Sequence, residues 1–226
     1  MKARGRVLLL VGSPRGPKST SESLGMYLLD RLRERGLETE KVRIYPALRS
    51  VEGRKSLLSA VNRADVVVLA CPLYVDSPPS PVIRAMELIA KHRQAIEKPK
   101  QQWLLAISNC GFPEAHHNDT ALDIYRLFAL ESGIEWAGGL ALGGGPSIDG
   151  RSLDDLGGMA RNVTRALDLT AAALAEGQSV PQEAVDLMAR PLVPAWLYTL
   201  IGGFRWRRQA KKHGVQKKLR ARPYQQ

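Results

Sequence analysis

The stretch VLLLVGSPRGPKSTSESLG, from Val7 to Gly25, decides the fold. An apolar run of the kind found in buried strands stops at Gly12, and a loop of Gly, Ser, Pro, Arg and Lys follows. A cluster of hydroxyl residues, Ser19 to Ser21, then opens a segment whose apolar residues recur at helical spacing. The order strand, cationic loop and helix is typical of the first unit of a parallel α/β sheet.

The rest of the chain repeats this alternation of apolar runs and helical segments. We expect strands at 6–12, 37–48, 64–72, 102–109 and 134–145, and helices at 21–36, 54–63, 80–92, 118–133 and within 152–177. Right-handed crossovers between such strands predict a doubly wound five-stranded parallel sheet, in the simplest case with strand order 2-1-3-4-5. Ligands bind such sheets beyond the carboxyl ends of the first and third strands, where the loops 12–20 and 71–80 lie.

Composition indicates a globular protein with an unusual carboxyl-terminal segment. The chain has 226 residues, 44% of them hydrophobic, and two cysteines in no metal-binding pattern, which suits a reducing cytoplasm. Of the net charge of +11, ten cations without any acidic residue follow residue 189, so the first 189 residues carry only +1. We expect a domain at 1–178 and a helical, basic extension at 179–226.

The loop after the first strand predicts a phosphate site. Residues 12–19, GSPRGPKS, differ by one residue from the nucleotide-binding pattern GxxxxGK[ST], because Pro17 stands in place of the second glycine and has no N–H to donate. The third strand ends in Ala-Cys-Pro, without an acidic residue to hold magnesium, and the dinucleotide pattern GxGxxG is absent. Hydroxyls, cations and the N–H groups of a helix start remain as ligands for a phosphate monoester, from Ser13, Arg15 or Lys18, Ser19, Thr20 and Ser21. The alternative is plain helix capping, since Ser19 and Glu22 match a capping box.

Two further loops complete the predicted site. Residues 71–81 hold prolines and a small apolar and aromatic platform, Leu73, Tyr74 and Val75, that suits a planar ring or simply packs a helix. Residues 108–119 follow the fourth strand, where Gly111 permits a close approach of the backbone to a ligand. Residues 143–147, GGGPS, are either another loop facing the ligand or only a turn.

Three motifs in this order resemble a known family. The GSPR loop with its hydroxyl cluster, PLYVDSPP after the third strand and SNCGF after the fourth resemble the flavodoxin-like NADPH-dependent FMN reductases and quinone-reductase-type oxidoreductases, over roughly residues 6 to 175. The resemblance implies that Ser13, Arg15, Ser19, Thr20 and Ser21 hold the FMN phosphate. It implies that Pro72, Leu73, Tyr74 and Val75 pack along the isoalloxazine, and that Asn109, Cys110, Gly111 and Phe112 border its other side or its edge. Some relatives carry a cysteine-rich iron–sulfur motif, which this sequence lacks.

These inferences predict an FMN-dependent oxidoreductase that passes hydride from NADH or NADPH to a small acceptor, such as a quinone or a flavin. The flavin carries the chemistry, so no side chain is expected to be catalytic and no metal is expected. The alternative is a flavodoxin-like electron carrier or flavin-binding module without turnover of NAD(P)H. We expect a cytoplasmic homodimer that binds no nucleic acid.

Single residues near this site have simpler interpretations. His116 and His117 point about 100° apart on a helix, so a shared metal is not expected, although one of them at a loop tip could touch a substrate. Cys110 is interpreted as a small spacer beside the ring rather than as a redox group.

The carboxyl-terminal segment has an apolar stripe before its cations. Val193, Trp196, Leu197, Leu200, Ile201 and Phe204 share one helical face, although Gly202 and Gly203 weaken the helix. The segment is too short and too interrupted to cross a bilayer. We expect the stripe to dock on its own domain or on a second subunit. Peripheral contact of the 193–222 tail with a membrane is the alternative.

Overall fold

The structure, a computed structural model, describes residues 5–222, so the outermost residues of both predicted domains lie outside the described part. Its centre is a five-stranded sheet in the order β2-β1-β3-β4-β5, in which every neighbouring pair is parallel. The strands are β1 (Arg6–Val11), β2 (Glu38–Arg43), β3 (Val66–Pro72), β4 (Trp103–Asn109) and β5 (Glu135–Leu142). The predicted doubly wound topology is therefore confirmed, and its switch point lies between β1 and β3.

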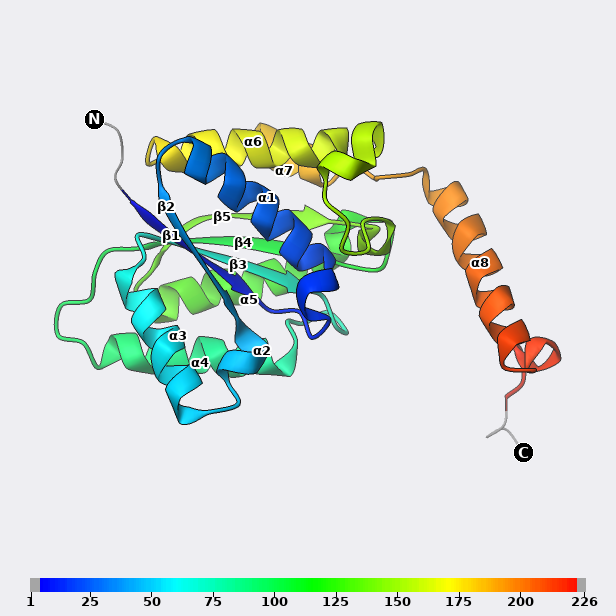
Figure 1. Ribbon diagram of the computed structural model, residues 1–226, viewed down its shortest axis with the longest axis horizontal. Coiled ribbons are helices and arrows are strands. Elements are labelled where there is room, and N and C mark those ends of the chain that lie inside the picture. Colours follow the sequence, from blue (N-terminus) through cyan, green and yellow to red (C-terminus); the bar gives the residue numbers. More distant parts are fainter. Residues whose placement is uncertain (1–4, 223–226) are drawn as a thin grey trace. The chain divides into compact units, whose positions relative to one another are not determined.

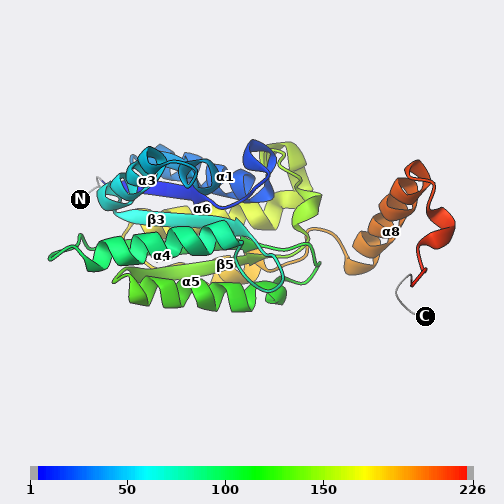
Figure 2. The ribbon, with the colours of Figure 1, turned by 90° about the horizontal axis from the view of Figure 1, so that it is seen from below.

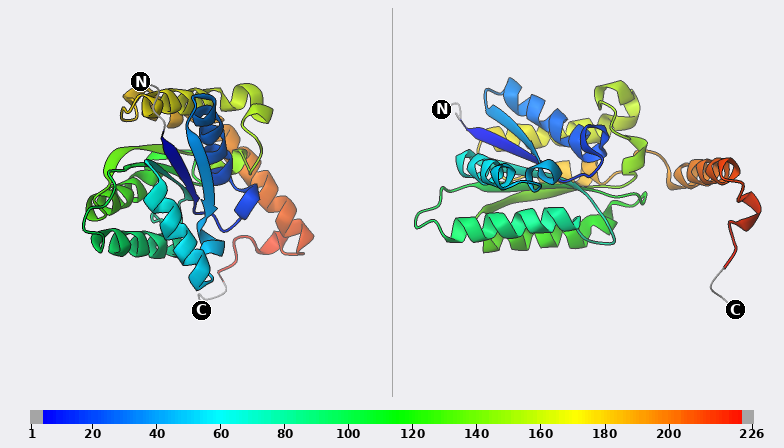
Figure 3. Two further views of the ribbon diagram at one scale, coloured as in Figure 1. Left: turned by 60° about the vertical axis from the view of Figure 1, so that its left-hand side comes forward. Right: turned by 60° about the horizontal axis from the view of Figure 1, so that its bottom comes forward.

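Helices cover both faces of this sheet. The α-helices are α1 (Thr20–Glu34), α2 (Ile44–Ala47), α3 (Val51–Arg63), α4 (Ser80–Gln94), α5 (Asp119–Glu131), α6 (Arg161–Ala175), α7 (Gln182–Met188) and α8 (Ala195–Lys212). Short 3₁₀ helices are η1 (Gly16–Lys18), η2 (Ala115–Asn118), η3 (Gly145–Ser147), η4 (Asp154–Ala160) and η5 (Gln216–Lys218). Figure 1 shows α1, α6 and α7 on one face and α3, α4 and α5 on the other. Figure 2 shows α4 side by side with α5, and Figure 3 shows the same layers from two further sides.

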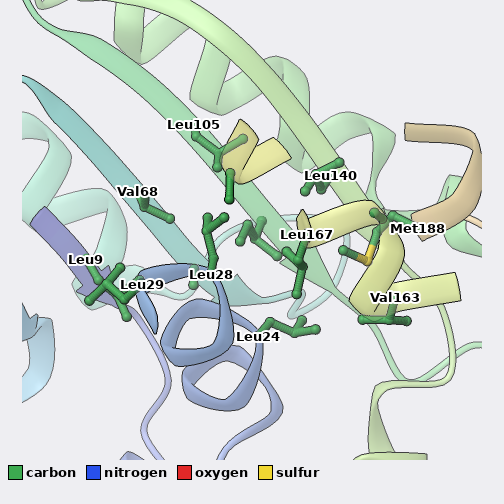
Figure 4. Close-up of a cluster of buried hydrophobic side chains, with 14 of the residues drawn as sticks. Leu9, Leu24, Leu28, Leu29, Val68, Leu105, Leu140, Val163, Leu167 and Met188 are labelled. Atoms are coloured by element: carbon green, nitrogen blue, oxygen red, sulfur yellow. The ribbon is translucent and has the colours of Figure 1, made fainter. Parts of the chain in front are cut away.

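The alternation of side chains along the strands divides the interior into two cores. Val7, Leu9 and Val11 of β1 are buried against α1, α6 and α7, whereas Leu8 and Leu10 are buried against α3, α4 and α5. Figure 4 shows the first of these cores, where leucines of α1 and α6 meet residues of β1, β3, β4 and β5. Burial on both faces explains why β1 reads as a continuous apolar run.

The second predicted strand is shorter than expected. The sequence predicts a strand over 37–48, but β2 ends at Arg43 and the next four residues form the short helix α2. Pro46 lies in the first turn of this helix, where its missing N–H costs no hydrogen bond. In a strand the same proline would interrupt the ladder, so the chain turns before it.

The chain divides into two compact units, Met1–Leu192 and Val193–Gln226. The sequence placed a boundary at 178/179, but α7 lies beyond it and buries Ala184, Leu187 and Met188 in the core beside α6. The second unit holds the predicted carboxyl-terminal helix, α8, followed by η5. Among the described residues no helix is both long enough and apolar enough to cross a membrane.

Candidate functional site

The start of the loop between β1 and α1 is packed tightly against β3 and α4. The N–H of Gly12 donates to the carbonyl of Ala70 at 2.9 Å, so this residue continues the ladder with β3. A Cβ on Gly12 would lie 2.4 Å from the Sγ of Cys71 and 2.5 Å from a methyl of Val82, so only glycine fits. The chain then turns through η1 and enters α1 at Thr20, which directs the N–H groups of the first helical turn toward the loop.

The predicted capping box forms only in part. The hydroxyl of Ser19 accepts the N–H of Glu22 at 3.2 Å, as an N-cap does. The carboxylate of Glu22 turns away to β2, where it pairs with Lys41 and Arg43, each at 2.7 Å. The hydrogen bond from Arg43 is the main cause that lowers the pKa of this buried carboxyl. Because the carboxylate is held on β2, it does not compete with an anion at the helix start.

The hydroxyl groups at the helix start are also partly engaged. Thr20 donates its proton to the carbonyl of Gly145 at 2.8 Å, so this proton is not offered to a ligand. Ser21 accepts a hydrogen bond from Asn109 at 2.8 Å, and Ser13 accepts one from the N–H of Arg15 at 3.3 Å. A hydroxyl that accepts keeps its own proton to donate. Ser13, Ser19 and Ser21 therefore remain donors for an anion.

The cation of this loop is paired in the structure. Arg15 contacts Asp149 at 2.7 Å, and both side chains are about half exposed (55% and 45%). Asp149 precedes Gly150, which has a φ of +74° and lies so close to the loop that a Cβ would be 2.5 Å from the carbonyl carbon of Lys18. The segment after β5 thus packs on the loop after β1 and brings a counter-charge to Arg15.

The loop after β3 makes a tight turn at residues 74–77. Tyr74 and Ser77 exchange backbone hydrogen bonds at 2.9 and 3.3 Å, and both central residues, Val75 and Asp76, have positive φ (50° and 58°). Two central residues with positive φ are typical of a type I′ turn. Val75 is 97% exposed at the tip of this turn.

The loop after β4 places a cysteine and an aromatic stack beside the sheet edge. Cys110 is buried and its thiol contacts the carbonyls of Phe112 and Glu114 at 3.4 and 3.6 Å. Burial raises the pKa of the Cys110 thiol, which is therefore neutral at physiological pH. The ring of Phe112 lies 4.3 Å from that of His117, which lies 4.5 Å from that of His116.

The three loops meet around one cavity of about 300 Å³ at the carboxyl edge of β1, β3 and β4. Eleven of the fourteen predicted site residues line it: Ser13, Arg15, Ser19, Thr20, Ser21, Pro72, Leu73, Tyr74, Asn109, Cys110 and Gly111. Three do not, namely Lys18, Val75 and Phe112. The roles of all fourteen as cofactor ligands stay predictions.

Sequence reasoning missed two residues that line the cavity, Gly145 and Pro146. They belong to the GGGPS segment, for which the sequence left open a ligand-facing loop or a plain turn. Its position on the cavity follows from the hydrogen bonds of Gly145, which accepts from Thr20 and donates to the carbonyl of Cys110 at 2.9 Å. Within the described residues no group of three His, Cys, Asp or Glu side chains is arranged to hold a metal.

Comparisons with known proteins agree with this geometry. The family model described as NADPH-dependent FMN reductase matches residues 5–111, a segment that contains the loops after β1 and β3 and the start of the loop after β4. A search of curated proteins found no match.

Solved structures share the fold at low sequence identity. A putative quinone reductase from Klebsiella pneumoniae has a TM-score of 0.58 and 14% identity, covering 78% of this chain and 87% of its own. An FMN-dependent NADH-azoreductase from Bacillus anthracis, solved with FMN, has a TM-score of 0.54 and 15% identity, covering 75% and 99%. An NADH:FMN oxidoreductase in its apo form has a TM-score of 0.54 and 17% identity, covering 84% and 96%.

The strand order and the family match agree with each other. Over residues 5–111 the chain is similar to the NADPH-dependent FMN reductases, and its sheet has the flavodoxin-like strand order.

Proposed function

We propose that this chain transfers hydride from NAD(P)H through bound FMN to a small acceptor such as a quinone or a free flavin. The observation that carries the proposal is the convergence of three motif loops on one cavity at the start of α1. The family match spans the first two of these loops and the start of the third, and it supplies the class of cofactor and reductant.

The helix start is suited to the phosphate of the cofactor. The N–H groups of the first turn of α1 and the hydroxyl protons of Ser13, Ser19 and Ser21 give neutral donors, and Arg15 adds positive charge. The carboxylate of Glu22, in the first turn of α1, is neutralised on β2. These residues hold the phosphate monoester and thereby fix the position of the whole cofactor.

The remaining lining residues suit a planar ring. Pro72, Leu73 and Tyr74 give an apolar wall on one side, and the segment from Asn109 to Gly111 gives a polar edge on the other. The amide of Asn109 is held by donation to Ser21 and to the carbonyl of Cys71, so its oxygen keeps a fixed direction. FMN supplies the hydride chemistry when bound, and the chain binds, orients and shields the ring. The neutral thiol of Cys110 acts as a spacer in this proposal.

The absorbance spectrum of the purified protein, with and without NADPH, tests the proposal. Bound flavin should give visible absorbance that bleaches rapidly on mixing with NADPH or NADH and returns when a quinone is added. Protein that retains no flavin and shows no flavin-dependent oxidation of NAD(P)H would refute it. Retained flavin that only another protein reduces would identify an electron carrier instead.

We further propose that the protein is a cytoplasmic homodimer. Both cysteines are free and buried, which suits a reducing compartment. Leu127 and Leu130 lie three residues apart on α5 and are 56% and 74% exposed, so they offer an apolar contact for a second copy. Sedimentation of the wild type and of the double variant Leu127→Asp/Leu130→Asp tests this, because a dimer through α5 would dissociate in the variant.

A further inference from the structure

Helix α8 carries a surface that the proposed reaction does not use. It has eighteen residues and belongs to the second compact unit. Large apolar side chains are exposed on it, among them Trp196 (69%), Leu200 (64%) and Phe204 (69%). No Asp or Glu follows position 189, so this unit has no acidic side chain that could pair with the cations of α8.

The apolar and the cationic residues of α8 share one face. At about 100° per residue, Trp196, Leu197, Leu200, Ile201 and Phe204 fall within an arc of about 140°. Arg207, Arg208, Lys211 and Lys212 fall on nearly the same arc, one to two turns further along. The face is thus apolar in the first half of the helix and cationic in the second. We call it the α8 face.

The cationic half also has a concave part. Arg205, Arg208, Lys211 and Lys212 line a hollow of about 670 Å³ together with Gln209 and His213. Four cations around one hollow, with no carboxylate among the lining residues, suit a phosphate group.

This arrangement disfavours a second copy of α8 as the partner. A parallel pair through the α8 face would bring the cations of both helices together. An antiparallel pair would set the apolar half of one helix against the cations of the other. Either pairing leaves charge uncompensated, and the first 189 residues, with a net charge of +1, offer no excess of negative charge.

We infer that the α8 face binds an anionic lipid surface. Its apolar half can enter the boundary between acyl chains and headgroups, and its cationic half can meet lipid phosphates along the same line. The long stems of Arg and Lys reach from a partly inserted helix to the phosphate layer. An anionic membrane is a partner that presents apolar and negative groups side by side.

Vesicle co-sedimentation of the full-length protein tests this inference. Vesicles of phosphatidylcholine with about 30% phosphatidylglycerol should bind the protein, and vesicles of phosphatidylcholine alone should bind it at least about tenfold less. The variant Arg207→Gln/Arg208→Gln/Lys211→Gln/Lys212→Gln should bind the anionic vesicles at least about 100-fold more weakly, since each cation near the surface contributes about fivefold. High salt should weaken the binding of the wild type.

A variant of the apolar residues and a matched control distinguish binding through the α8 face from non-specific adsorption to vesicles. Trp196→Ser/Leu200→Ser/Phe204→Ser should lose most vesicle binding. Trp206→Ser should keep it, because Trp206 is also 69% exposed but lies on the opposite side of the helix. An unchanged circular dichroism spectrum and an unchanged thermal unfolding midpoint show that each variant folds.

Three results would overturn the inference. They are no binding to anionic vesicles, equal binding to both vesicle types, and an equal loss of vesicle binding in the control and in the apolar variant. Self-association that disappears in the apolar variant, without vesicle binding, would instead assign the face to a second copy.

Discussion

At the scale of single residues, the structure adds most to the predicted role of Arg15 as a phosphate ligand. It lines the cavity but pairs with Asp149 at 2.7 Å, so a phosphate has to replace that carboxylate as its partner. Arg15→Ala should weaken FMN binding about 10- to 150-fold, because charge-assisted hydrogen bonds contribute about 1.5–3 kcal/mol. Riboflavin, which lacks the phosphate, should lose much less, and fluorescence titration with both ligands measures the difference.

A matched variant makes this prediction specific. Arg126 is also exposed and paired with a carboxylate, Asp123, but it lies on α5 and does not line the cavity. Arg126→Ala should leave both affinities unchanged. If Arg15→Ala weakens FMN and riboflavin equally, Arg15 is not a phosphate ligand and Lys18 becomes the candidate.

Glu22 gives a prediction about pH. The pKa of its carboxyl is lowered from the ordinary 4.5, mainly by the hydrogen bond from Arg43. Its ion pairs therefore stabilise the fold fully at pH values above 4.5. Glu22→Gln should lower the free energy of unfolding at pH 7 by about 1–3 kcal/mol, less than a fully buried pair, because Lys41 and Arg43 are about a third exposed. This difference should shrink as the pH falls through the lowered pKa, where the wild-type carboxyl also becomes neutral.

Urea unfolding at a series of pH values measures the effect. Glu34→Gln, on the same helix but in an exposed ion pair with Arg31, is the control and should change the stability by less than about 0.5 kcal/mol. A stability difference for Glu22→Gln that stays constant from about pH 7 to pH 2 would show that the ion pairs are not its cause.

At the scale of elements, the turn after β3 stores strain. Val75 has a φ of 50°, a conformation that costs an L residue about 1–2 kcal/mol and is least suited to a β-branched side chain. Its side chain is 97% exposed, so no contact compensates. Val75→Asn should therefore raise the free energy of unfolding by about 0.5–1 kcal/mol, since Asn tolerates this conformation.

The same variant tests whether Val75 contacts the cofactor, as the resemblance implies. Unchanged FMN affinity would remove Val75 from the ligands, as its absence from the cavity lining already suggests. A stability gain accompanied by weaker FMN binding would mean that the strain serves the site. Val51→Asn is the control, because Val51 is 51% exposed at the start of α3 and has no positive φ to relieve.

The helices and strands also show where sequence patterns are sufficient to predict an element. β1 and β3 could be predicted because burial on both faces demands a continuous apolar run, and α1 because its apolar residues recur at helical spacing. Helix α2 could not be predicted, because the apolar residues of 44–48 suit a strand as well as a buried turn. Only the position of Pro46 favoured the helix, and that signal concerns a single residue.

At the scale of the whole chain, topology predicted the position of the cavity better than any single motif. The strand order brings the loops after β1 and β3 together at the switch point, and this alone locates the cavity. The pairing of Arg15 with Asp149 could not be predicted, because it joins residues 134 positions apart through the packing of Gly150 on the loop. Contacts of this kind depend on the conformation of two loops rather than on periodicity.

The division of the chain gives the last prediction. Among the described residues, both buried cores end by Met188, and Leu192 is the last side chain packed against them. Deleting 193–226 should therefore change the free energy of unfolding by less than about 0.5 kcal/mol and leave FMN affinity within about twofold, since the cavity lies before residue 147.

Deleting 179–226 is the matched comparison, because it cuts at the boundary that the sequence suggested. This longer deletion removes α7 and with it three buried side chains, Ala184, Leu187 and Met188. Each buried Leu or Met contributes about 1.5–3 kcal/mol, so the loss should exceed about 3 kcal/mol and lower the unfolding midpoint clearly. Urea unfolding of the two truncated proteins beside the full chain measures both effects. Equal stability of the two would place the end of the folded unit before α7, and a large loss in the shorter deletion would extend that unit into α8.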